Sequence, residues 1–223
     1  MAEKLTIAVL GGTGDLGGGL AWQLVQAGYP VIIGSRAQDK ALVSATALSQ
    51  RAGGKTVHGM ANPDAAAAAD LVILTVPFAS HKPTLQSIRA AVQGKIFVDA
   101  TVPLMPPKVM RVQMPKAGSA AREAQDYLGE EVRVVSAFQN VAADHLNADE
   151  AHLDDCDVLV AGNDPQARET IVQLAQEMGM QAWHAGPIDN AAVAESLTSV
   201  LIFMNKRYKF PGAGIKISGG RAA

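Results

Sequence analysis

The sequence has one cysteine, few aromatic residues and no long apolar run. Cys156 alone cannot form an internal disulfide and fits no spacing of metal ligands. The formal net charge is only −2, so no overall field attracts nucleic acid or an anionic membrane. No apolar run approaches the roughly 18–20 residues that a membrane-spanning helix needs, and MAEKLTIAV leaves no room for a signal peptide. We therefore expect a soluble cytoplasmic protein without a nucleic-acid or membrane partner.

Several catalytic motifs are also absent. Short-chain dehydrogenases need a Tyr-x-x-x-Lys pair, but the fourth residues after the three tyrosines are Ile33, Glu131 and Gly212. No Gly-x-Ser-x-Gly elbow occurs. No two histidines stand three or four residues apart, as metal ligands on a helix would. The acidic segment between His145 and His152 is the one remaining metal candidate, and a solvated loop is the simpler interpretation, so we expect no metal site.

The first part of the chain has the spacing of a mononucleotide-binding βαβ unit. The apolar run from Leu5 to Leu10 predicts a buried strand, which a Gly-x-Gly-x-x-Gly turn follows directly. The first glycine allows the tight turn, the second lets the backbone approach a pyrophosphate, and the third lets the helix pack closely. A helix ending at Gly28 and a strand at Val31–Ile33 complete the unit. We expect a dinucleotide to contact Gly12, Thr13, Gly14, Asp15, Leu16 and Gly17.

The residues after the second strand favour NADP(H) over NAD(H). NAD-binding units usually place an acidic residue there to bind the ribose 2′-hydroxyl, but this chain has Gly34-Ser35-Arg36. A carboxylate would repel a 2′-phosphate, whereas a hydroxyl and a guanidinium bind it. Lys40 adds a second cation and Thr13 a hydroxyl, so we predict a 2′-phosphate pocket of Thr13, Ser35, Arg36 and Lys40. The alternative for the two cations is an ordinary solvated helix start.

Short apolar runs alternate with helical patterns along the rest of the chain. This alternation predicts an α/β fold of the doubly wound Rossmann type, with a mainly parallel sheet extended by C-terminal strands and a small helical C-terminal part. The predicted strands are Leu5–Leu10, Val31–Ile33, Lys55–Met60, Leu71–Val76, Lys95–Ala100, Arg133–Ala137, Val158–Ala161 and Gln181–Ala185. The predicted later helices are Asp39–Ala52, one that Asn62 caps, Thr84–Val92, one from a Ser119 cap to Leu128, Pro165–Met178 and Asn190–Tyr208.

Ligands in this architecture bind at the carboxyl ends of the parallel strands. Val76, Pro77 and Phe78 follow the fourth predicted strand and Val102 follows the fifth, so we expect them to wall the cofactor cleft. Simple packing is the alternative for Phe78. The segment 103–118, rich in proline and methionine, either lines a pocket for a flat ligand or forms a surface loop. The apolar tail at 211–217 is expected to dock on its own domain or on a second subunit.

The predicted site has a nicotinamide pocket but no evident acid, base, metal or nucleophile. One reaction suits such a site, namely hydride transfer between carbon centres that both belong to cofactors. Its rate depends on holding two rings in contact, so no side chain has to carry a proton.

Further motifs are spread over almost the whole chain. They are IAVLGGTGDLGGGLA at 7–21, VIIGSR at 31–36, LVILTVPF at 71–78, VVSAFQNVAADHL at 134–146, AGPIDNAAVAESLTSVLIFMN at 185–205 and GAGIKI at 212–217. Together they resemble the NADPH-dependent coenzyme F-420 reductases, also called F-420:NADP oxidoreductases. The resemblance implies hydride transfer between NADP(H) and coenzyme F-420, an 8-hydroxy-5-deazaflavin, and it implies the same four 2′-phosphate residues.

The resemblance also implies how the acceptor site is built. Ala137, Gln139 and Val141 would lie beside the nicotinamide and the deazaflavin as positioning residues, with Ala137 also contacting NADP(H). Gln139 stands where the family commonly has a histidine, and a glutamine can hydrogen-bond a ring carbonyl but cannot carry a proton. We assign residues 1–145 to an NADP-binding Rossmann domain. Residues 146–223 would form a C-terminal lobe that completes the acceptor site and contacts the second subunit of a homodimer.

Two other functions fit the residues. The first is an NADPH-dependent reductase of a flavin, a quinone or a metal chelate. The second is a non-catalytic NADPH sensor that reports the redox ratio to a protein partner.

Overall fold

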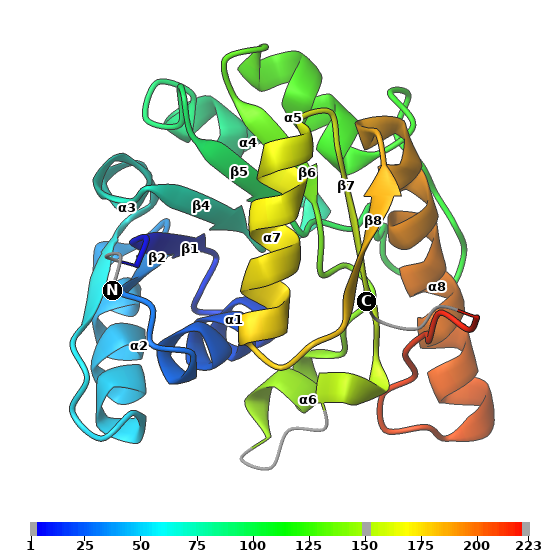
Figure 1. The fold of residues 1–223 in the computed structure, drawn as a ribbon, viewed down its shortest axis with the longest axis horizontal. Coiled ribbons are helices and arrows are strands. Elements are labelled where there is room, and N and C mark those ends of the chain that lie inside the picture. Colours follow the sequence, from blue (N-terminus) through cyan, green and yellow to red (C-terminus); the bar gives the residue numbers. More distant parts are fainter. Residues whose placement is uncertain (1–3, 149–152, 220–223) are drawn as a thin grey trace.

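The computed structural model describes residues 4–148 and 153–219, so the metal candidate that includes His152 lies partly outside the described residues. Within these ranges eight strands form one sheet in the order β3-β2-β1-β4-β5-β6-β7-β8 (Figure 1). Neighbouring strands are parallel except β6 and β7. The strands are β1 (Ile7–Leu10), β2 (Val31–Ser35), β3 (Val57–Ala61), β4 (Leu71–Leu74), β5 (Ile96–Asp99), β6 (Arg133–Ser136), β7 (Val158–Gly162) and β8 (Ala182–Gly186).

Helices cover both faces of this sheet, which confirms the predicted doubly wound α/β architecture. The helices are α1 (Asp15–Gln26), α2 (Gln38–Arg51), α3 (Asn62–Ala68), α4 (Phe78–Ile88), α5 (Ala120–Leu128), α6 (Ala143–Asn147), α7 (Pro165–Glu177) and α8 (Ala191–Tyr208). Alternate residues of each strand point to opposite faces. Ile7 and Val9 therefore belong to a core shared with α1, α2 and α7, whereas Ala8 and Leu10 belong to a core shared with α3, α4 and α5.

The glycine turn after β1 shows why its glycines are needed. A Cβ on Gly17 would lie 2.5 Å from Thr75 Oγ1 and 2.6 Å from the Gly11 carbonyl oxygen, so only glycine lets α1 pack this closely. A Cβ on Gly14 would have only the Gly11 oxygen near it, at 3.5 Å. Gly14 therefore leaves the mouth of the turn open, as a turn that receives a phosphate requires.

Two predicted helix starts are wrong. Asn62 is the first residue of α3 and makes no capping hydrogen bond, because the extended Ala61 occupies the cap position. Helix α4 begins at Phe78 rather than Thr84, with Pro77 as its cap and Pro83 inside it.

The apolar tail docks on its own domain, the first of the two predicted alternatives. The backbone N–H of Asp157 donates to the Ile215 oxygen at 2.8 Å, and the Ile217 N–H donates to Asp157 Oδ2 at 2.8 Å. Part of the segment 103–118 lies on α8, since the hydroxyl of Ser199 donates to the Arg111 oxygen at 3.4 Å.

Across residues 4–148 and 153–219, no helix combines the length and the apolar character needed to cross a membrane.

Candidate active site

A cleft of about 230 Å³ opens where β1, β2, β3 and β4 end. It gathers all four residues predicted for the 2′-phosphate, and Val76 and Pro77 also line it. The complete lining is Gly11, Thr13, Gly14, Ser35, Arg36, Ala37, Lys40, Asn62, Thr75, Val76, Pro77 and Ser80. The strand ends thus bring together residues that are up to 69 positions apart in the sequence, from Gly11 to Ser80.

The charges at one end of this cleft suit an anion. Arg36 and Lys40 are exposed, and neither forms an ion pair with a carboxylate of the described residues. Ser35 is buried at the end of β2, where its Oγ accepts a hydrogen bond from the Ala37 N–H at 3.3 Å. The Ser35 hydroxyl hydrogen can then point to a ligand. Two unpaired cations and a hydroxyl are the groups that bind a phosphate dianion.

The start of α1 provides a second anion-binding element in the same cleft. Gly14 occupies the N-cap position without a side-chain hydrogen bond to the helix, so the first N–H groups of α1 face the turn. Such N–H groups and the helix dipole favour a pyrophosphate. Asp15 lines an adjoining depression that shares Thr13 and Gly14 with the cleft, and Leu16 packs against the core.

The remaining predicted site residues do not line this cleft. Phe78 and Val102 are half-buried, and the Phe78 ring stacks on His81 with 5.9 Å between ring centres. Ala137 and Val141 are buried in the core. Gln139 is buried too, and its Nε2 donates to the Asp99 oxygen at 2.7 Å and to Ser136 Oγ at 2.8 Å.

The arrangement of Gln139 corrects one expectation. Both hydrogens of its amide are used within the protein, so the expected hydrogen bond from Gln139 to a ring carbonyl is not available in this arrangement. Its Oε1 is buried and lacks a hydrogen-bond partner in the described part of the chain. The Gln139 backbone oxygen accepts from Thr198 Oγ1 at 2.8 Å, which ties the loop after β6 to α8. Phe138, at φ 73°, holds this loop in a left-handed turn and buries its ring completely.

Comparison with known proteins identifies the family. Residues 6–103 match the model of the family described as NADP oxidoreductase coenzyme F420-dependent. The chain is 42% identical to an F420-dependent NADP reductase of Methanothermobacter thermautotrophicus over 96% of this chain and 95% of that protein. It is 39% identical to an F420-dependent NADP reductase of Methanocaldococcus jannaschii over 96% of this chain and 98% of that protein.

The chain belongs to the F420-dependent NADP reductase family. The fold agrees with the solved structure of a protein from Arthrobacter sp. FB24 that is assigned as an F420-dependent NADP reductase. It superposes with a TM-score of 0.80 at 29% identity, covering 96% of this chain and 100% of that chain. The predicted resemblance and fold are therefore confirmed.

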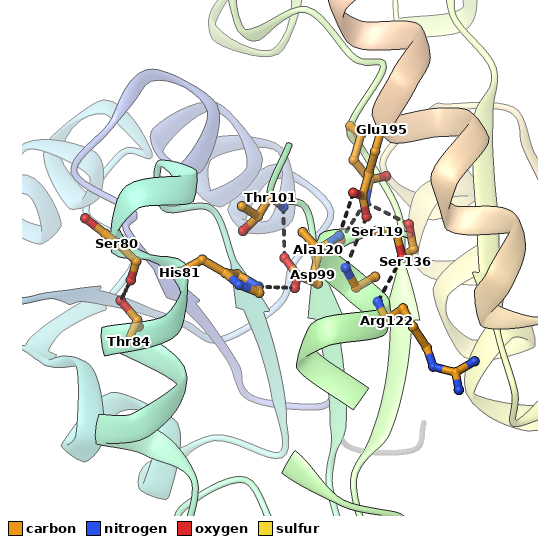
Figure 2. A network of polar contacts seen from close by, with 12 residues as sticks. Ser80, His81, Thr84, Asp99, Thr101, Ser119, Ala120, Arg122, Ser136 and Glu195 are labelled. Carbon is orange, nitrogen blue, oxygen red and sulfur yellow. Dashed lines mark hydrogen bonds and ion pairs between the residues drawn. The ribbon is translucent and has the colours of Figure 1, made fainter. Parts of the chain in front are cut away.

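In this family member, a buried ion pair lies beside the cofactor cleft and was not predicted from the sequence. The pair is formed by His81 of α4 and Asp99 at the end of β5 (Figure 2). The distance between His81 Nε2 and Asp99 Oδ2 is 2.6 Å. Their side chains are only 2% and 0% exposed. Burial alone would lower the pKa of His81, but the charge and hydrogen bond of Asp99, with Glu123 and Glu195, outweigh it and raise the pKa.

Glu195 of α8 is a second buried acid in this region. Its carboxylate accepts hydrogen bonds from the backbone N–H groups of Ala120 at 2.7 Å and Ala121 at 3.1 Å, at the start of α5 (Figure 2). Burial raises the pKa of Glu195 to about 8, although these two N–H groups favour its charged form. The predicted Ser119 cap is confirmed, since its hydroxyl accepts from the Arg122 N–H. Glu195 thus joins α8 to the same helix start.

The polar network holds the carboxyl edge of the sheet in place. Asp99 uses Oδ1 to accept from the Thr101 N–H at 2.9 Å, while its backbone oxygen accepts from Gln139. The ion pair therefore connects α4, β5 and the loop after β6. The sequence signal for this ion pair is Asp99, an acidic residue at the end of the otherwise apolar strand β5. Among the described residues, no group of three or more His, Cys, Asp and Glu could hold a metal ion.

Proposed function

We propose that this chain transfers hydride between NADP(H) and coenzyme F-420. The observation that carries the proposal is the cleft that collects Thr13, Ser35, Arg36 and Lys40 in a chain of this family. The family supplies the identity of the second substrate, because its curated members are named F420-dependent NADP reductases.

The residues of the cleft bind and orient the cofactor. Arg36 and Lys40 neutralise the 2′-phosphate, while the hydroxyls of Ser35 and Thr13 donate to its oxygens. The first N–H groups of α1 receive the pyrophosphate beside Gly14. Bound NADP(H) supplies or accepts the hydride.

A second set of residues fixes where the two rings meet. Val76 and Pro77 line the cleft, whereas Phe78 and Val102 lie outside its lining, in the segments that follow β4 and β5. Ala137, Gln139 and Val141 shape the loop after β6 from within, since all three are buried. Because this loop is tied to β5 and α8, it would give the two rings a rigid support, which favours hydride transfer.

We also propose a homodimer in which residues 146–223 complete the acceptor site. The support is a line of exposed apolar side chains along α8, formed by Val193, Val200 and Phe203 at 61%, 45% and 51% exposure. Their spacing of seven and three residues places them on one face of the helix, and an exposed apolar face of this kind is typical of an interface. A cytoplasmic location stays a prediction from the sequence.

The function is tested by mixing the purified protein with NADPH and oxidised coenzyme F-420 and following the loss of deazaflavin absorbance. FMN, a quinone and a ferric chelate are offered separately at equal concentration. The proposal predicts that the deazaflavin is reduced fastest. Faster turnover of another acceptor would reassign the substrate, and NADPH binding without any turnover would support a sensor instead.

A further inference from the structure

Asn62 is a buried polar residue of the cofactor cleft to which the sequence assigned no ligand. It opens α3 directly after β3, and it is only 3% exposed. Its Oδ1 has no hydrogen-bond partner within the described residues, and its side chain does not cap the helix. A buried polar atom without a partner is rare in a folded protein and calls for an explanation, such as a ligand that supplies the missing donor.

The sheet register places Asn62 beside the 2′-phosphate residues. Ser35 pairs with Ala61 in the parallel ladder of β2 and β3, so Arg36 and Asn62 are the next residues at two adjacent strand ends. A Cβ added at Gly34 would lie 3.0 Å from Asn62 Oδ1, so this oxygen sits directly against the end of β2. Arg36 and Asn62 line the same cleft.

The chemistry of the missing partner follows from this position. Asn62 Oδ1 is an acceptor, so the ligand atom must carry a hydrogen. A phosphate that Arg36 binds sits on C2′ of the adenosine ribose, and the neighbouring carbon carries the 3′-hydroxyl, which is a donor. Many NAD-binding sites accept the ribose hydroxyls with a carboxylate, which would repel a 2′-phosphate here. An amide oxygen offers the same acceptor without the charge.

We propose that Asn62 Oδ1 accepts a hydrogen bond from the 3′-hydroxyl of the adenosine ribose of NADP(H). This inference rests on the proposed function, because it takes NADP(H) as the ligand of the cleft. Arg36 then distinguishes NADP(H) from NAD(H), whereas Asn62 recognises the ribose that both nucleotides share.

The test compares the full-length wild type with Asn62→Ala and Asn62→Asp. Dissociation constants are measured for NADPH, for its 3′-deoxyribose analogue and for its hypoxanthine analogue, which lacks the adenine amino group. The wild type should bind the 3′-deoxy analogue about 3- to 10-fold more weakly than NADPH, as one neutral hydrogen bond predicts. Asn62→Ala should bind NADPH that much more weakly and no longer distinguish the two. Asn62→Asp keeps the acceptor but adds a charge, so NADPH binding should fall more than NADH binding.

Two further measurements separate a binding role from a structural one. Because Asn62 Oδ1 has no hydrogen-bond partner within the described residues, Asn62→Ala should unfold at the same temperature as the wild type without nucleotide, and its loss of activity should appear in the KM for NADPH. The matched control is Asn163→Ala, which removes an oxygen that accepts from the Ile188 N–H at 3.2 Å. This control should lose thermal stability and keep its NADPH affinity.

The outcomes are distinct. Equal discrimination against the 3′-deoxy analogue by wild type and Asn62→Ala would overturn the inference while leaving the proposed function intact. Discrimination against the hypoxanthine analogue alone would move the hydrogen bond to the adenine and overturn the ribose assignment. A wild type that binds no NADPH would instead overturn the proposed function.

Discussion

The buried His81–Asp99 pair allows a quantitative prediction about stability. Asp99→Asn keeps the shape of the side chain and an oxygen that can accept from the Thr101 N–H, but it removes the charge 2.6 Å from His81 Nε2. The side chains of His81 and Asp99 are 2% and 0% exposed, so neither can be solvated by water when the pair is broken. Breaking a buried ion pair from one side costs about 3–5 kcal/mol. We therefore expect Asp99→Asn to lower the free energy of unfolding by about this amount.

The effect depends on pH with a definite sign. The pKa of His81 is raised in the folded protein above its ordinary value of 6.5, so folding favours the protonated ring. The stabilisation is complete below pH 6.5 and is lost as the pH rises through the folded-state pKa. Asp99→Asn removes the main charge that raises this pKa. The difference in stability between wild type and variant should therefore shrink as the pH rises.

Urea unfolding at a series of pH values measures both effects. The matched control is Glu169→Gln, which breaks an ion pair with His184 at 3.0 Å whose side chains are 53% and 43% exposed. Water and salt screen that pair, so the control should leave the free energy of unfolding nearly unchanged. If both variants lose the same stability, or if Asp99→Asn keeps the pH slope of the wild type, the buried pair does not stabilise the fold as argued.

Three more predictions concern the cofactor cleft and the second buried acid. Arg36→Ala should weaken NADPH binding by about 1.5–3 kcal/mol and leave NADH nearly unchanged, as measured by titration calorimetry; equal losses for both nucleotides would exclude a 2′-phosphate role. Gly17→Ala should abolish NADPH binding in a fluorescence titration, because its Cβ would lie 2.5 Å from Thr75 Oγ1, whereas Gly18→Ala, with its nearest atom at 3.6 Å, should still bind. Burial raises the pKa of Glu195 from 4.5 to about 8, so folding favours its protonated form and thermal stability should fall as pH rises from 4.5 through 8. Glu195→Gln should flatten that profile, and an unchanged slope would refute the assignment.

The cofactor cleft could be predicted from the sequence because its chemistry lies in short segments. The glycine turn holds Thr13, and Ser35, Arg36 and Lys40 follow a single strand, so local spacing and the carboxyl-end rule were enough to bring them together. The positions of the eight strands could be predicted too, because each is a short apolar run between helical patterns.

The buried polar residues could not be predicted because each depends on a partner from a distant element. His81 meets Asp99 across 18 positions, and Glu195 reaches the start of α5 across 75 positions to Ala120. An acidic residue at the end of an apolar strand singles out Asp99, but the local sequence does not indicate which residue it contacts. The cap role of Asn62 was predicted from local preference and the ring contact of Gln139 from the family resemblance. In both residues, tertiary packing decides which groups the side chain contacts.

The central claim is direct hydride transfer from one bound ring to another. The most direct test uses NADPH carrying deuterium at one or the other transferable position of the nicotinamide, with oxidised coenzyme F-420 as acceptor. The reduced deazaflavin is then analysed by mass spectrometry. Direct transfer predicts that one of the two labelled forms passes its deuterium to the deazaflavin and the other does not. A reduced deazaflavin without deuterium from either form, or no reduction while NADPH is bound, would contradict it.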